Sequence, residues 1–120
     1  MKVIIAGSRH MPIDQQYLIS KAIKKSGFKI SEVVCGMAKG ADTWGLWWAL
    51  HHDIPVKRFP ADWDTYGKAA GPIRNKQMAD YADAAIIFIW DGSRGSENMR
   101  VQMEKLKKPV YIVRNGVIPE

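Results

Sequence analysis

The sequence predicts an α/β protein built on a parallel sheet that helices cover on both faces. Short apolar runs alternate with longer amphipathic stretches, which is the pattern of parallel strands joined by helices. The run at residues 84–90 is apolar at every position, as expected for a strand that is covered on both faces. Segments rich in glycine and serine follow several of these runs, where a strand gives way to a helix.

Five strands are expected, each marked by a short apolar run. They lie at residues 3–6, 31–35, 55–59, 84–90 and 109–113. The third run is short and polar, which is typical of a strand at the edge of a sheet. The fourth is the most apolar, and the sequence therefore places it nearest the middle of the sheet.

Four helices are expected between the strands. They lie at about residues 13–26, 41–52, 72–81 and 96–107. Gly27 suits the C-terminal cap of the first helix, and Pro72 is expected at the first position of the third. Right-handed crossovers with one reversal of direction give three layers and the strand order 3-2-1-4-5. We therefore read residues 1–120 as a single Rossmann-like domain.

Composition excludes several classes of protein. The chain has 120 residues, of which 47% are hydrophobic and 25% charged, values that are ordinary for a folded globular protein. No apolar run approaches the roughly 20 residues of a membrane helix, and no secretory leader is recognisable, so we expect a cytoplasmic protein. Cys35 is the only cysteine, which excludes an intrachain disulfide and a structural zinc site. The net charge of +6 favours anionic partners in general.

The first candidate site lies where the order of the strands reverses, between strands one and four. Ligands of such sheets bind there, beyond the carboxyl ends of the strands. Gly7, Ser8 and Arg9 follow the first strand. The segment after the fourth strand consists of Asp91, Gly92, Ser93, Arg94, Gly95 and Ser96. Glycine, hydroxyl and guanidinium groups at the start of a helix suit a phosphate, but both segments are also compatible with simple tight turns, with Ser96 as helix N-cap.

The loops after strands two and three add further candidates. Gly36, Lys39 and Asp42 follow strand two, but their spacing matches neither the dinucleotide fingerprint nor the P-loop. Asp62 and Trp63 follow strand three, and an indole at a strand end is able to stack on a base or to serve as a packing residue.

Arg74 and Asn75 begin the third helix. Arg74 shares a helical face with Met78 and Tyr81, which predicts that it points to the upper rim of the sheet and contacts a ligand. The alternative is an ion pair with an aspartate of the preceding loop. Asn75 adds an amide close by.

Several of these segments resemble a known family. In their order, residues 6–9, 36–42, 59–63, 71–78 and 92–96 resemble the YspA-like, YpsA-related branch of the SLOG superfamily over nearly the whole chain. The resemblance implies a Rossmann-like fold and the binding of nucleotides or nucleotide-derived ligands, in some members as sensors. For this branch it implies no settled reaction.

The chain departs from the enzymatic members of that superfamily at one position. Members that cleave an N-glycosidic bond carry a glutamate where this sequence has Met99. Glu97 lies about 200° around the helix from the required direction. Met99 is expected in the core, on one stripe with Met103 and Leu106. We therefore assign no catalytic residue and leave open whether the protein is an enzyme.

The sequence favours a protein that binds a phosphorylated nucleotide-derived ligand, such as an ADP-ribose relative or a cyclic nucleotide, as a sensor or a sequestering protein. No cofactor or metal is required. One alternative is a nucleoside-monophosphate phosphoribohydrolase that uses an aspartate. A less favoured one is single-stranded nucleic-acid binding, since the basic residues are spread over helix ends. Leu46, Trp47 and Leu50 are expected to form the interface of a homo-oligomer, with an exposed patch on a monomer as the alternative.

Overall fold

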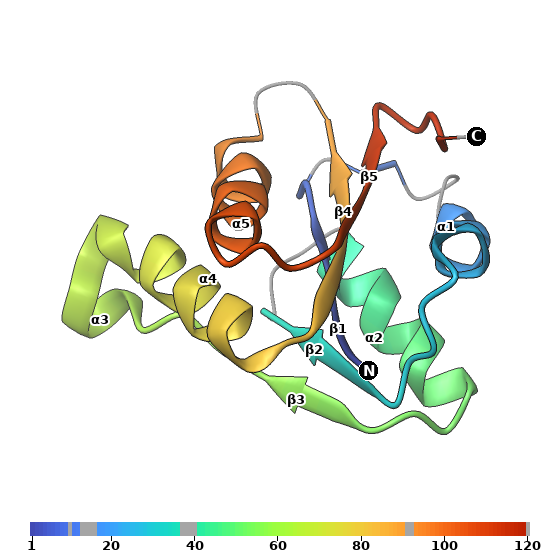
Figure 1. Ribbon diagram of the computed structural model, residues 1–120. Coiled ribbons are helices and arrows are strands. Elements are labelled where there is room, and N and C mark those ends of the chain that lie inside the picture. Colours follow the sequence, from blue (N-terminus) through green and yellow to red (C-terminus); the bar gives the residue numbers. More distant parts are fainter. Residues whose placement is uncertain (10, 13–16, 37–40, 91–92, 120) are drawn as a thin grey trace.

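The computed structural model describes the chain except for residues 10, 13–16, 37–40, 91–92 and 120 and the side chain of Ala41. A sheet lies between two layers of helices, with α1 and α2 on one face and α4 and α5 on the other (Figure 1). The elements, in chain order, are β1 (Lys2–Gly7), α1 (Leu18–Ser26), β2 (Glu32–Cys35), α2 (Ala41–His51), β3 (Val56–Arg58), α3 (Trp63–Tyr66), the 3-10 helix η2 (Gly67–Ala69), α4 (Ala70–Tyr81), β4 (Ala84–Ile89), α5 (Arg94–Lys105) and β5 (Val110–Arg114).

The five described strands are all parallel and lie in the order β3-β2-β1-β4-β5. This confirms the predicted sheet and its order, with β3 at an edge. The sequence placed β4 nearest the middle, but β1 takes that position, and β4 lies beside it with all six residues buried. Gly7 pairs with Phe88, so the carboxyl ends of β1 and β4 lie next to each other at the point where the strand order reverses.

The core consists of two layers, one on each face of the sheet. Along β1, Val3 and Ile5 pack with the residues of α1 and α2, whereas Ile4 and Ala6 pack with those of α4 and α5. This alternation follows from the period of two in a strand. All four side chains are almost fully buried, which is why the run is apolar throughout.

Helix α2 approaches the sheet unusually closely at Gly45. A Cβ atom on this glycine would lie 2.5 Å from Cγ2 of Ile5, so only a residue without a side chain fits. Trp44 and Trp48 pack against the same core layer. Leu46 is half-buried, while Trp47 and Leu50 are exposed on the other side of the helix, as the sequence predicts.

Two helices begin earlier than the sequence suggests. Helix α4 starts at Ala70, so Pro72 occupies its third position instead of its first. The first amides of a helix have no helical acceptor, and the missing N–H of proline therefore costs nothing there. Helix α5 starts at Arg94 with Ser93 as its N-cap residue, which rules out Ser96 in that role.

Other boundaries agree more closely. Gly27 caps α1 with a φ of 74°, as predicted, while the expected start of that helix near residue 13 falls on residues outside those described. On α5, Met99 and Met103 are buried, but Leu106 is 43% exposed because the helix ends before it.

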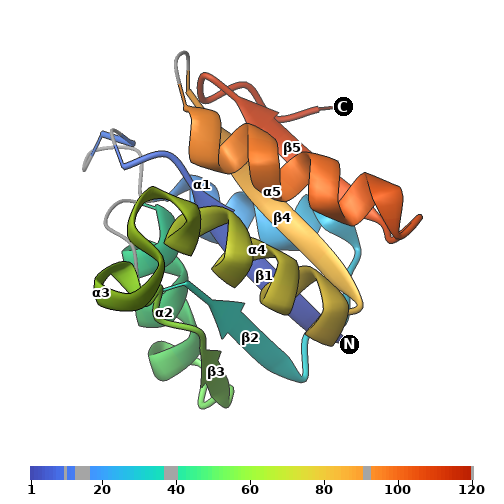
Figure 2. The same ribbon diagram turned by 90° about the vertical axis from the view of Figure 1, so that its left-hand side faces the viewer.

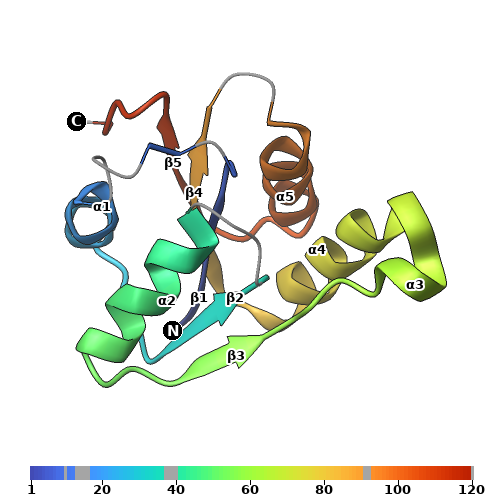
Figure 3. The ribbon, with the colours of Figure 1, turned by 180° about the vertical axis from the view of Figure 1, so that it is seen from behind.

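The segment formed by α3 and η2, residues 63–69, was not predicted as helical. Neither element contains a buried residue, so no apolar periodicity marks it in the sequence. The carboxylate of Asp62 caps α3 by accepting a hydrogen bond from the backbone N–H of Thr65 at 3.1 Å. Figures 2 and 3 show that α3 stands away from the sheet, at the N-terminal end of α4. Among the described residues, no helix has the length and apolar character needed to cross a bilayer.

Candidate functional site

A pocket of about 590 Å³ opens at the carboxyl ends of β1 and β4, a volume within the range of small-molecule sites. Eleven of the sequence-predicted residues line it: Gly7, Ser8, Arg9, Asp42, Trp63, Arg74, Asn75, Ser93, Arg94, Gly95 and Ser96. Gly36 and Asp62 do not line it. Lys39, Asp91 and Gly92 lie outside the described residues.

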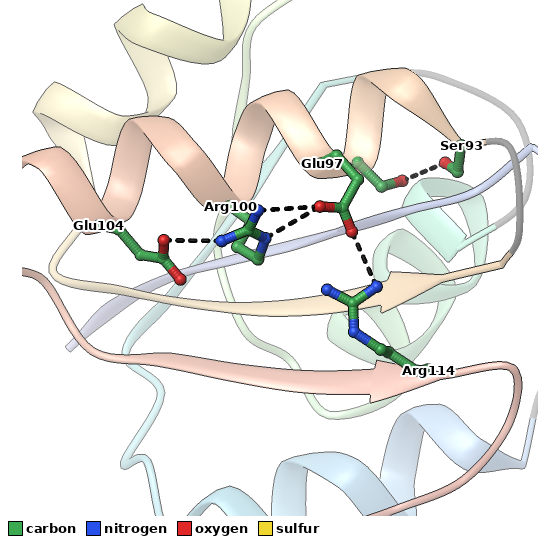
Figure 4. A network of polar contacts seen from close by, with 6 residues as sticks. Ser93, Glu97, Arg100, Glu104 and Arg114 are labelled. Carbon is green, nitrogen blue, oxygen red and sulfur yellow. Dashed lines mark hydrogen bonds and ion pairs between the residues drawn. The ribbon is translucent and has the colours of Figure 1, made fainter.

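The turns after β1 and β4 meet at this pocket. The backbone N–H of Ser8 donates to the carbonyl oxygen of Phe88 at 2.8 Å, which holds the first turn against the end of β4. The side chain of Ser93 donates to the hydroxyl oxygen of Ser96 at 2.7 Å (Figure 4). Ser8 and Ser96 are almost fully buried. The sheet register thus brings together two hydroxyl-bearing turns that are far apart in the sequence.

The N-terminus of α5 also faces this region. The first hydrogen bond of the helix runs from the N–H of Glu97 to the carbonyl oxygen of Ser93, at 3.2 Å. The amides of residues 94–96 precede that bond and have no helical acceptor. Together they give the N-terminus a partial positive charge, which favours an anion.

Arg74 is held by two hydrogen bonds at the side of the pocket. Its Nη1 donates to the carbonyl oxygen of Gly36, and its Nε donates to Oδ1 of Asn75 at 3.1 Å. A Cβ atom on Gly36 would lie 2.7 Å from Nη1, so the glycine leaves room for the guanidinium. No ion pair joins Arg74 to Asp62 or Asp64, the alternative considered from the sequence, among the contacts of the described residues.

Asp42 is a buried carboxylate in the same pocket and is 3% exposed. Its Oδ1 accepts a hydrogen bond from the N–H of Gly7 at 3.2 Å, which connects the start of α2 with the end of β1. Its Oδ2 lies 3.0 Å from the position that a Cβ on Gly36 would take. Asp42 therefore lies against the ends of two strands, β1 and β2.

Two arginines repel each other across the site. Burial lowers the pKa of Arg74 below its ordinary value, and the positive charge of Arg9 acts in the same direction. The negative charge of Asp42 opposes this shift. An anion between Arg9 and Arg74 would relieve the repulsion between the two guanidinium groups.

Asn75 connects α4 with α5. Its Nδ2 donates to the carbonyl oxygen of Gly95 at 3.2 Å and to Oδ1 of Asn98 at 3.0 Å, while its Oδ1 accepts from Arg74. The side chain is 5% exposed. These contacts are with protein groups, so Asn75 orients Arg74 and the first turn of α5.

The pocket has residues that the sequence analysis did not select, among them Lys68 and Asn98. Lys68 belongs to η2, which carries no apolar pattern, and Asn98 is identified only by its contact with Asn75. With Lys68 included, the described lining carries four cationic side chains and one acidic side chain. They are Arg9, Lys68, Arg74 and Arg94 against Asp42.

The thioether of Met99 is buried at the position where the resemblance implies a glutamate in the enzymatic members of the superfamily. Met99 is 1% exposed and lies at the pocket. Glu97 pairs instead with Arg100 at 3.0 Å and with Arg114 at 2.8 Å (Figure 4). Burial alone would raise the pKa of Glu97, but hydrogen bonds from Arg114 and Arg100 hold it below its ordinary value. Among the described residues, no three side chains of His, Cys, Asp or Glu gather as metal ligands would.

Comparison with known proteins agrees with the resemblance seen in the sequence. The model of the YspA, cpYpsA-related SLOG family matches residues 1–66. No significant match is found among curated proteins. The fold is similar to the X-ray structure of DNA processing protein A (DprA) from Streptococcus pneumoniae, with a TM-score of 0.75 and 20% identity. The match covers 97% of this chain and 52% of DprA, so the chain spans about half the length of that protein.

Proposed function

Because the chain belongs to the YspA, cpYpsA-related SLOG family, we propose that its pocket binds a phosphorylated, nucleotide-derived ligand. ADP-ribose relatives and cyclic nucleotides are the ligand types we favour, and the protein acts as a sensor of the ligand or sequesters it. The observation that carries the proposal is the charge of the pocket, whose described lining includes four cationic side chains and one carboxylate at the point of strand reversal.

In this proposal the phosphate lies between the turns after β1 and β4. Ser8 and Ser93 line the pocket together with Arg9 and Arg94. Guanidiniums donate charged, strong hydrogen bonds to phosphate oxygens. The hydroxyl of Ser93, which donates to Ser96 in the structure, turns toward the phosphate in this proposal. The amides at the start of α5 add a favourable field.

Arg74 addresses the sugar or a second phosphate. Its guanidinium is oriented in advance by Gly36 and Asn75, so little conformational freedom is lost on binding. Asp42 keeps the turn after β1 in place through the amide of Gly7.

Titration calorimetry with AMP, cyclic AMP, ADP-ribose and adenosine tests the proposal. We expect at least one phosphorylated compound to bind, and adenosine to bind at least tenfold more weakly. Arg9→Gln weakens that binding, whereas Arg58→Gln, the same change at an exposed site on β3, leaves it unchanged. The absence of binding at millimolar concentrations of all these ligands would end the proposal.

The same mixtures distinguish binding from catalysis. A phosphoribohydrolase would release free base from a nucleoside monophosphate, with an aspartate in place of the missing glutamate. Chromatography after prolonged incubation detects the base. We expect the nucleotide to be recovered intact, in accord with Met99 at the position of the enzymatic glutamate.

Single-stranded nucleic acid is the remaining candidate ligand. The solved structure with a similar fold is titled a DNA processing protein. If this chain shares that property, an oligonucleotide is retained by it at low salt and released as salt rises. We rank this candidate below a small nucleotide because most of the 18 basic residues lie outside the pocket, and the sequence spreads them over helix ends rather than along one stripe.

We also propose that α2 joins two copies of the chain. Trp47 is 53% exposed and Leu50 is 56% exposed, while Leu46 is half-buried beside them. An interface through these residues would remove apolar surface from water. Light scattering checks this: a monomer at micromolar concentration contradicts the interface, and a dimer that Trp47→Glu dissociates supports it.

A further inference from the structure

The pocket is lined in part by a segment that contains no buried residue. Residues 63–69 make up α3 and η2, and neither element has a buried residue. Figures 1 and 3 show this segment outside the layer of α4 and α5. Two of its residues, Trp63 and Lys68, nevertheless line the pocket. Packing into the core does not explain why a tryptophan stands there.

The indole of Trp63 rests on the start of α4 and remains half open. A Cβ atom on Gly71 would lie 3.5 Å from Cη2 of Trp63, so the ring lies beside the backbone of the helix. The residue is still 51% exposed. A planar ligand at the pocket would cover apolar ring surface that is now in water, which is favourable.

Tyr66 provides a comparison within the same short helix. It is 50% exposed, nearly the same as Trp63, but it does not line the pocket. The two aromatic residues therefore share an element and a degree of exposure, and differ in their position relative to the pocket.

We propose that Trp63 is the platform on which the base of the bound nucleotide stacks, while the phosphate lies at the turns of Ser8 and Ser93. This inference rests on the proposed function and extends it to the orientation of the ligand. Nucleobases offer a π face to an aromatic ring whatever their substituents. Lys68, on the same segment, adds a positive charge to the lining of the pocket, which favours an anionic ligand over a neutral one.

The arrangement defines a class of ligand. The ligand carries an aromatic base and a phosphate that are separated by a sugar, and a purine gains more from stacking than a pyrimidine because its ring is larger. A sugar phosphate without a base reaches only the phosphate end. Stacking by itself does not select one purine over another.

Calorimetric titration with AMP and ribose 5-phosphate tests the inference, because only AMP has a base. In Trp63→Ala we expect the affinity for AMP to fall by about 5- to 150-fold, the range that loss of one base–aromatic stack produces. The affinity for ribose 5-phosphate changes by less than about twofold. Trp63→Phe keeps most of the AMP affinity, and Tyr66→Ala keeps all of it. Since Trp63 and Tyr66 are half exposed on a segment without buried residues, these variants are expected to fold.

Two results overturn the inference and leave the proposed function standing. One is an unchanged AMP affinity in Trp63→Ala. The other is an equal loss of AMP and ribose 5-phosphate affinity, which would mean that Trp63 shapes the pocket without stacking on the base. Failure of AMP to bind the unmodified protein overturns the inference, and failure of cyclic AMP and ADP-ribose as well, at concentrations up to millimolar, overturns the proposed function with it.

Discussion

The guanidinium of Arg74, on α4, donates a hydrogen bond to the carbonyl oxygen of Gly36, at the end of β2. This contact joins α4 to the end of β2 and holds a positive charge at the wall of the pocket, which Arg74 lines. The contact also depends on the absence of a side chain at residue 36, because a Cβ atom there would lie only 2.7 Å from Nη1 of Arg74.

Gly36→Ala is therefore expected to displace the guanidinium of Arg74 and weaken ligand binding by about tenfold, the effect of losing one charged hydrogen bond. The atoms nearest the new methyl group are side-chain atoms, from the guanidinium of Arg74 and the carboxylate of Asp42, and none belongs to the backbone. We therefore expect little disturbance of the fold itself. Calorimetry and thermal unfolding measure the two effects separately. A variant with full affinity would show that the position of Arg74 does not matter for the ligand.

Asn75→Ala is expected to lower the free energy of unfolding by about 1–3 kcal/mol, because Gly95 and Asn98 each lose a buried hydrogen-bond partner. Ligand affinity falls as well, since Arg74 loses the acceptor of its Nε. Urea unfolding measures the first effect. Gln77→Ala, at an exposed position of the same helix, is the control and is expected to change stability by less than about 0.5 kcal/mol. Equal stability of the two variants would contradict the role given to Asn75.

Gly45→Ala is expected to destabilise the protein by about 1–3 kcal/mol through overpacking. Alanine is the better helix former by about 1 kcal/mol, but the new Cβ would lie only 2.8 Å from Cβ of Ile5, which sits on the backbone of the central strand and has no room to move. Gly95→Ala is the matched control, since its Cβ meets no atom within 4 Å. If thermal unfolding places both variants at the same midpoint, the close approach of α2 to β1 is refuted.

The stability of the protein is expected to depend on Glu97 in acid. Its pKa in the folded protein lies below its ordinary value of 4.5, so the ion pairs with Arg100 and Arg114 contribute fully above that pH. Their contribution is lost as the pH falls through the lowered pKa. Glu97→Gln is thus less stable than the unmodified protein at pH 7, by about 0.2–1 kcal/mol because the pairs are partly exposed. The difference narrows as the pH falls through the lowered pKa, and a constant difference from pH 7 to pH 2 would contradict the assignment.

The fold was largely predictable because its signals are local. Each strand is a short apolar run, and the alternation of strands and helices fixes the parallel order through the handedness of the crossovers. That order alone placed the turn of Ser8 beside the turn of Ser93. The α3–η2 segment was missed for the opposite reason, since it buries no residue and leaves no periodic pattern.

The partners inside the site were less predictable. The sequence indicated that Arg74 faces the rim of the sheet, but its hydrogen-bond acceptor is the backbone carbonyl of Gly36, 38 residues away. Every residue except the last has such a carbonyl, so the residue types in the sequence do not identify this acceptor. Asn75 was expected to contact a ligand, and it lines the pocket, but the sequence did not indicate that its amide also contacts Gly95, Asn98 and Arg74. Such contacts depend on the relative placement of α4 and α5, which residue patterns within one helix do not specify.

A crystal structure of the protein grown with ADP-ribose tests the central claim most directly. We expect phosphate oxygens within hydrogen-bonding distance of the hydroxyl groups of Ser8 and Ser93. Electron density for the ligand at any other surface, with no ligand atom near those two serines at saturating concentration, would contradict it.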